Sequence, residues 1–216
     1  MVDFRVNWEA VRAIVFDLGN VLLDLDNERF ENGWPLDIGA ADPAFAGWAQ
    51  HQNLFYRYDT GQISSEALVA TLAERLGLTA KQVTDYWNEI LLPGINPTRY
   101  ETLEKLKPHY PLYVLSNTND LHIDWVREHV ISHGHPDFER EFFVKTFYSQ
   151  RLGSLKPEPS IYEQAQSGIG LPAEQLLFID DREENVEEAR RQGWQSVQLE
   201  PGRPVEQVLV GAKGMG

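Results

Sequence analysis

Three acidic residues and a lysine lie at or just after apolar runs, where buried strands are expected to end. Asp17 follows AIVF, and Asp180 and Asp181 follow LLFI. Lys156 lies in the loop after a predicted strand at 145–150. Carboxylates that lie close together raise one another's pKa unless a cation neutralises them. Mg²⁺ suits such an all-oxygen site best, and a nearby lysine would bind an anion, so these residues predict phosphoryl chemistry in which Asp17 attacks phosphorus.

Ser116 and Asn117 follow another apolar run, PLYVL, and would supply a hydroxyl and an amide to the same anion. Each polar residue taken alone also fits an ordinary turn or helix cap. Turn chemistry does not explain why acids and a lysine gather at one edge, and the carboxyl ends of parallel strands are where ligands bind in open sheets.

The elements that must position these residues alternate from residue 99 onward. After the first strand, which ends at Asp17, we predict strands and helices that cover both faces of a parallel sheet. The fold class is α/β, with a doubly wound (Rossmann-like) parallel-sheet core and an inserted all-helical cap domain. The predicted strands are 111–117, 145–150, 175–180 and 196–200, and the predicted helices are 99–107, 119–131, 159–167 and 182–192.

The segment 27–98 lacks a convincing strand pattern and is typical of a string of helices. Thr79 and Gln82 form a capping-box pattern, and Asp42 before a proline predicts another helix start. A helical insert of this length is large for a loop. We therefore predict a catalytic core of residues 1–26 and 99–216 and a helical cap of residues 27–98.

Composition narrows the class of partner. The chain has 216 residues, a net charge of −14 and no cysteine, which excludes disulfides and cysteine-ligated zinc. Net acidity without a basic patch disfavours nucleic acid and anionic membrane surfaces, and the apolar runs are too short to span a bilayer. We expect a cytoplasmic protein, a monomer or weak homodimer, whose partner is a small phosphorylated metabolite.

Four stretches, FDLGNVLLD, VLSNTND, SLKPEPSIY and FIDDREENVEEAR, resemble motifs one to four of the haloacid dehalogenase superfamily, in that order. The resemblance covers about residues 11 to 200, and DLGNV and LSNTN are most similar to the α-D-glucose-1-phosphate phosphatase-like branch. It implies that Asp17 is the nucleophile and that Ser116, Asn117 and Lys156 contact or balance the transferring phosphoryl group. It also implies a set of Mg²⁺ ligands: Asp17, the Gly19 carbonyl oxygen, Asp180 and Asp181.

One position departs from the pattern of that superfamily. Most of its phosphatases carry a second aspartate, a general acid, two residues after the nucleophile, where this chain has Gly19. The loss of that acid lowers the reaction rate least when the leaving group is a stable anion, such as the anomeric oxygen of a sugar 1-phosphate. Asp24, His51 and Asp59 are candidate replacements, and the sequence does not select among them.

Two alternatives remain open. A 2-haloacid dehalogenase-type hydrolase also uses an aspartate nucleophile without the second aspartate, although the Asp180-Asp181 pair has no use in a metal-free enzyme. A catalytically silent phosphate-binding module would also lack the general acid at Gly19.

Overall fold

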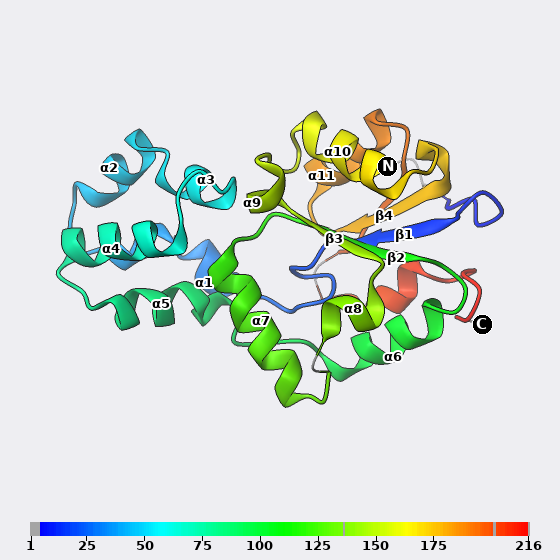
Figure 1. The fold of residues 1–216 in the computed structure, drawn as a ribbon, viewed down its shortest axis with the longest axis horizontal. Helices are drawn as coiled ribbons and strands as arrows, with labels where there is room; N and C mark the ends of the chain where they lie inside the picture. The colour runs from blue at the N-terminus through cyan, green and yellow to red at the C-terminus, as the bar shows by residue number, and fades with distance from the viewer. Residues whose placement is uncertain (1–4, 136, 201, 216) are drawn as a thin grey trace.

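The computed structural model describes residues 5–135, 137–200 and 202–215 and is built around one sheet. The sheet has five parallel strands in the order β3-β2-β1-β4-β5 (Figure 1). The strands are β1 (Ala13–Phe16), β2 (Leu112–Ser116), β3 (Lys145–Tyr148), β4 (Leu176–Asp180) and β5 (Gln195–Gln198). Because β1 lies in the middle, its tip adjoins the tips of both β2 and β4.

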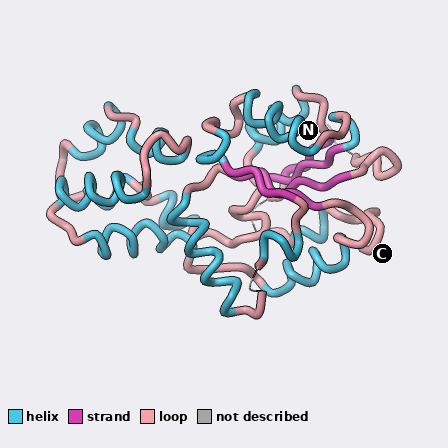
Figure 2. Tube along the Cα trace, viewed as in Figure 1, coloured by secondary structure: helices cyan, strands magenta, loops and turns pink. Residues whose placement is uncertain are grey.

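Helices cover both faces of the sheet, as Figures 1 and 2 show. Alternate residues of β1 point to opposite layers. Ala13 and Val15 belong to the apolar cluster under α10 and α11, whereas Ile14 and Phe16 belong to the cluster shared with α6, α7 and α8. This confirms the doubly wound α/β fold. The core helices are α6 (Pro97–Leu106), α7 (Asp120–Ser132), α8 (Phe138–Phe142), α9 (Ser149–Leu152), α10 (Pro159–Ile169) and α11 (Glu183–Arg191).

Between β1 and α6 the described chain forms a helical block set apart from the sheet (Figure 1). Its helices are α1 (Asn27–Glu31), α2 (Phe45–His51), α3 (Leu54–Asp59), α4 (Ser65–Leu76) and α5 (Ala80–Asn88). They enclose a small apolar cluster of their own, which includes Leu68, Leu72 and Trp87. Helix α5 packs on α7 and α3 packs on α9. The block therefore meets the core through helices that lead directly from the strand tips.

Of the two local predictions made for this block, one is confirmed and one is displaced. Thr79 and Gln82 form the capping box of α5. The helix expected at Asp42 begins later, at Phe45, because the Asp42 carboxylate instead accepts a hydrogen bond from the Ala44 N–H in a turn.

The third strand is shorter than predicted and ends at Tyr148. Ser149 leaves the sheet because its hydroxyl exchanges hydrogen bonds with the backbone N–H and carbonyl of Thr118, both at 3.0 Å, and α9 begins there. Short 3₁₀ helices complete the chain at Leu36–Gly39, Glu89–Leu91, Ala173–Gln175 and Val205–Val208. Among the residues described, none of the helices has the length and apolar character needed to cross a membrane.

Candidate active site

The sheet brings the predicted site residues to one edge. Asp17 follows the last residue of β1, and its N–H donates to the Ile179 carbonyl at 2.8 Å, which places it beside Asp180 at the tip of β4. Ser116 ends β2 on the other side of β1. Parallel register thus assembles groups that lie far apart in the sequence.

The acidic residues form a tight cluster. One carboxylate oxygen from each of Asp17, Asp180 and Asp181 lies within 4.8 Å of the others. The Lys156 ammonium lies 2.8 Å from Asp17 Oδ1 and 2.6 Å from Asp180 Oδ2, and its side chain is 1% exposed. When all are ionised, three carboxylates against one ammonium leave two negative charges. A divalent cation would neutralise them, so the donor set fits Mg²⁺.

The electrostatics of the cluster follow from its burial. Burial raises the pKa of Asp17 to about 7, Lys156 opposes this rise, and Asp180 adds to it. Burial alone would lower the pKa of Lys156, but its contacts with Asp17 and Asp180 outweigh that effect and raise it. Burial also raises the pKa of Asp181. A bound cation would favour the ionised form of each carboxylate.

Neighbouring amides orient the acids. The Asn185 amide donates to both oxygens of Asp180, at 2.9 and 3.1 Å. The Asn20 amide donates to Asp181 Oδ2 at 2.9 Å, from a backbone in the left-handed region (φ 55°) that asparagine tolerates better than most residues. These side chains fix the carboxylates before any ligand binds.

The remaining predicted residues also reach the site. Ser116 and Gly19 line the pocket beside Asp17. The Asn117 amide donates to the Lys156 carbonyl at 2.9 Å, and its oxygen accepts from the Lys156 N–H at 2.7 Å. Asn117 therefore clamps the loop that carries Lys156, and a contact between this amide and a phosphoryl group stays a prediction.

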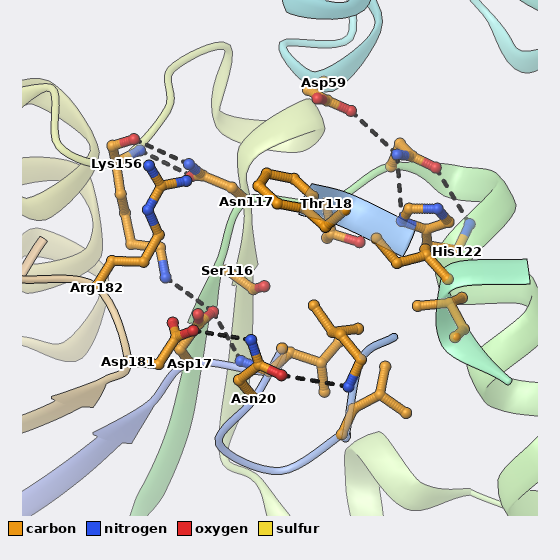
Figure 3. Close-up of a pocket in the computed structure, with 18 of the residues that line it drawn as sticks. Asp17, Asn20, Asp59, Ser116, Asn117, Thr118, His122, Lys156, Asp181 and Arg182 are labelled. Atoms are coloured by element: carbon orange, nitrogen blue, oxygen red, sulfur yellow. Dashed lines mark hydrogen bonds and ion pairs between the residues drawn. The ribbon is translucent and has the colours of Figure 1, made fainter. Parts of the chain in front are cut away.

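The pocket extends well beyond the acids and has a volume of about 660 Å³. We call the part lined by Asp17, Gly19, Ser116, Lys156 and Asp181 the strand-tip end. The other part, the distal end, contains residues that contact one another around Asp59: Phe30, Trp34, Asp59, Asn119 and His122. Figure 3 shows Asp59 and His122 on the side away from Asp17 and Asp181.

The three candidate replacements for the missing general acid lie in different parts of the structure. Asp24 lies in another groove, 3.8 Å from Arg99, and His51 is exposed on α2 and does not line the pocket. Asp59 lines the pocket, but at its distal end. We therefore see no support for any of the three as a proton donor beside Asp17.

Sequence reasoning missed the supporting amides and the distal groups. Asn20 and Asn185 lie inside the quoted motifs, and Asn185 lies in the first turn of the helix that follows the Asp180-Asp181 pair, which was an available signal. Asn119 and His122 are one helical turn apart on α7, but their direction toward the pocket depends on how the helical block packs.

Comparison with known proteins identifies the family. A family model described as haloacid dehalogenase-like hydrolase matches residues 11–193. The chain belongs to this family and is a hydrolase. The predicted family membership is thereby confirmed.

Relatives within the family have different activities. The chain is 27% identical to D-ribitol-5-phosphate phosphatase of Bacteroides thetaiotaomicron over 207 residues, which cover 92% of this chain and 97% of that protein. It is also 27% identical to (S)-2-haloacid dehalogenase 4A of Burkholderia cepacia, over 92% of this chain and 87% of that protein. Both phosphatases and dehalogenases are thus similar to it.

A solved structure extends the comparison to the fold. A HAD family enzyme of Bacteroides thetaiotaomicron, in a magnesium complex, superimposes with a TM-score of 0.76 at 28% identity and covers 90% of this chain and 96% of that chain. The same enzyme in complex with magnesium and inorganic phosphate gives a TM-score of 0.70 at 26% identity, covering 89% and 96%.

Proposed function

We propose that this chain is a Mg²⁺-dependent phosphatase that hydrolyses small phosphomonoesters, in particular sugar phosphates, through an aspartyl-phosphate on Asp17. The observation that carries the proposal is the buried cluster in which Lys156 contacts Asp17 at 2.8 Å beside two further carboxylates. Phosphatase relatives and the magnesium and phosphate complexes of a similar enzyme support it.

In the first step a carboxylate oxygen of Asp17 attacks phosphorus, and the bond from phosphorus to the ester oxygen breaks. The ester oxygen leaves with the bonding electron pair and takes a proton from water, because Gly19 offers no acid. Lys156 holds an oxygen of the transferring group, and Ser116 donates a hydrogen bond to it. Water then attacks phosphorus, which frees Asp17 and releases inorganic phosphate.

The proposed metal ligands are Asp17, the Gly19 carbonyl oxygen, Asp180 and Asp181. When bound, Mg²⁺ would offset the negative charge of the carboxylates and of the phosphoryl oxygens. Both Asp180 oxygens already accept hydrogen bonds from Asn185. We therefore assign Asp180 also to the positioning of Lys156, which it contacts at 2.6 Å.

We further propose that residues 27–98 act as a cap domain over the core of residues 1–26 and 99–216. Support comes from the separate apolar cluster of the helical block and from the pocket residues that it contributes, such as Trp34 and Asp59. The absence of an acid at Gly19 favours sugar 1-phosphates, whose anomeric leaving oxygen needs the least help.

A dehalogenase remains the second candidate because a relative of similar identity carries that activity. Against it stands the pairing of two adjacent acids at the tip of β4, held by Asn185 and Asn20. A metal-free reaction does not require two adjacent acids or the amides that orient them.

The decisive experiment measures phosphate release from a panel of sugar phosphates, nucleotides and flavin mononucleotide, with Mg²⁺ and with EDTA. We expect Mg²⁺-dependent release that falls at least about 10³-fold in Asp17→Asn. Asp120→Asn is the matched control, because Asp120 is exposed and does not line the pocket. Halide release from 2-chloropropionate without metal would favour the dehalogenase, and no release from any substrate would favour the silent module.

A further inference from the structure

The distal end of the pocket contains an isolated acid. Asp59, the last residue of α3, is the one acidic residue among those that line this end. The same end includes the aromatic side chains of Phe30 and Trp34, and burial raises the pKa of Asp59 to about 7. A carboxylate among apolar groups is costly unless it has a partner.

One oxygen of Asp59 has such a partner. The Asn119 amide donates to Asp59 Oδ1 at 3.0 Å. The orientation of this amide is fixed, because its oxygen accepts from the Trp87 indole N–H and from the His122 backbone N–H, both at 3.2 Å. The amide nitrogen must therefore face Asp59.

His122 does not supply a second partner. Its Nε2 lies 3.1 Å from the Trp87 carbonyl, which can only accept, so Nε2 carries the proton and Nδ1 is bare. Nδ1 lies 3.4 Å from the Asn119 amide nitrogen, and burial lowers the pKa of His122 to about 4, so the ring is neutral. The Trp34 ring stacks on the His122 ring, with 5.7 Å between the ring centroids.

The second oxygen of Asp59 consequently has no hydrogen-bond donor within the part of the chain that the structure describes. It belongs to a side chain on the wall of a cavity whose opposite end holds the proposed reaction centre. A ligand that reaches from Asp17 toward α3 brings its organic group to this oxygen.

We propose that Asp59 accepts a hydrogen bond from a hydroxyl group of the substrate, and so selects polyhydroxylated phosphomonoesters over apolar ones. The inference rests on the proposed phosphatase function and assigns the specificity of the same pocket. An apolar leaving group would displace water from Asp59 and leave a charged acceptor unmatched, which a site built for hydroxyls penalises strongly. The surrounding apolar side chains would pack on the carbon skeleton.

The test compares kcat/KM for ribitol 5-phosphate and pentyl phosphate, which have the same number of carbons and differ in hydroxyls. Asp59→Asn keeps an oxygen for Asn119 and removes the negative charge. We expect it to lower kcat/KM for ribitol 5-phosphate roughly 10- to 100-fold and to change that for pentyl phosphate less than about 3-fold. Asp59→Ala should enlarge the same selective loss, and Asp120→Asn should change neither value.

The outcomes separate this proposal from the one on which it rests. Equal losses on both substrates, or no loss on either, would overturn the role of Asp59 while leaving the phosphatase intact. A wild-type protein that prefers pentyl phosphate would overturn it without any variant. If the wild-type protein releases phosphate from neither ester and from no member of the wider panel, the phosphatase function itself is refuted.

Discussion

The two ends of the pocket are formed by different secondary-structure elements. At the strand-tip end, the acids and Ser116 lie at or directly after the ends of neighbouring strands of one parallel sheet, whose register fixes their spacing. At the distal end, Asp59 and His122 come from α3 and α7, which meet only where the helical block packs on the core. We infer that the sheet determines the chemistry and the helix packing determines the substrate.

Two buried carboxylates sharpen this comparison. Burial raises the pKa of Asp17 and of Asp59 to the same value, about 7. Asp17 faces the Lys156 ammonium and other acids, whereas Asp59, among the residues that the structure describes, accepts a hydrogen bond from the neutral Asn119 amide alone. Asp17 is therefore suited to react beside a cation, and Asp59 to accept a hydrogen bond from a neutral group.

The largest effect is expected at Lys156. Lys156→Met removes the one ammonium from the acid cluster, so kcat/KM should fall about 10²- to 10³-fold on every phosphomonoester alike. Lys145→Met is the matched control, because Lys145 is exposed on the edge strand β3. Steady-state phosphate release from ribitol 5-phosphate and pentyl phosphate measures both. A loss confined to one substrate would break the proposed division between the two ends.

Next in size is an effect on metal affinity. Asp181→Asn removes a negative charge from the cluster, so the Mg²⁺ concentration that gives half-maximal rate should rise about 10- to 100-fold. The ratio of rates on the two substrates should not change, because Asp181 lies at the strand-tip end. An unchanged Mg²⁺ requirement would remove Asp181 from the proposed ligands.

A smaller gain is expected at Gly19. Gly19→Asp restores the position of a general acid, and its Cβ would meet Leu25 Cδ1 at 2.9 Å, so Leu25 must rotate. We expect kcat/KM for glucose 6-phosphate to rise about 10-fold or more, and that for glucose 1-phosphate to rise less. Equal gains on both substrates would contradict the idea that leaving-group stability compensates for the missing acid.

The smallest effect concerns stability. Burial raises the pKa of Asp59 from 3.8 to about 7, so between these values the folded protein holds a proton that the unfolded chain has lost. The free energy of unfolding contributed by Asp59 therefore decreases as pH rises. His122 acts in the opposite direction, because burial lowers its pKa from 6.5 to about 4.

Removing Asp59 should remove its destabilising contribution at higher pH and leave the contribution of His122, which increases the free energy of unfolding as pH rises. From pH 4.5 to pH 7, the melting temperature of Asp59→Asn should rise relative to that of the wild type by about a few degrees. Differential scanning calorimetry at several pH values measures the difference, with Asp120→Asn as control. Parallel curves for the wild type and Asp59→Asn would show that Asp59 titrates alike in the folded and unfolded states.

The strand-tip end could be predicted from the sequence because its residues close apolar runs, and parallel strands bring such ends together. Asp17 and Asp180 meet for this reason, and Lys156 reaches them from a loop hydrogen-bonded to Asn117 at the end of β2. The distal end could not be selected, because Asp59 was one of three candidate general acids, with Asp24 and His51, and its direction depends on the contact with Asn119. The shift of the helix start from Asp42 to Phe45 is a local matter of turn chemistry and does not affect the pocket.

The covalent role of Asp17 is the claim on which the division between the two ends depends, and acid quenching tests it most directly. Wild-type protein is mixed with ribitol 5-phosphate and Mg²⁺, quenched with acid within a single turnover, digested and analysed by mass spectrometry. We predict one phosphoryl group on the peptide that contains Asp17, and none when Mg²⁺ is removed. A phosphoryl group on any other peptide would contradict the proposed mechanism.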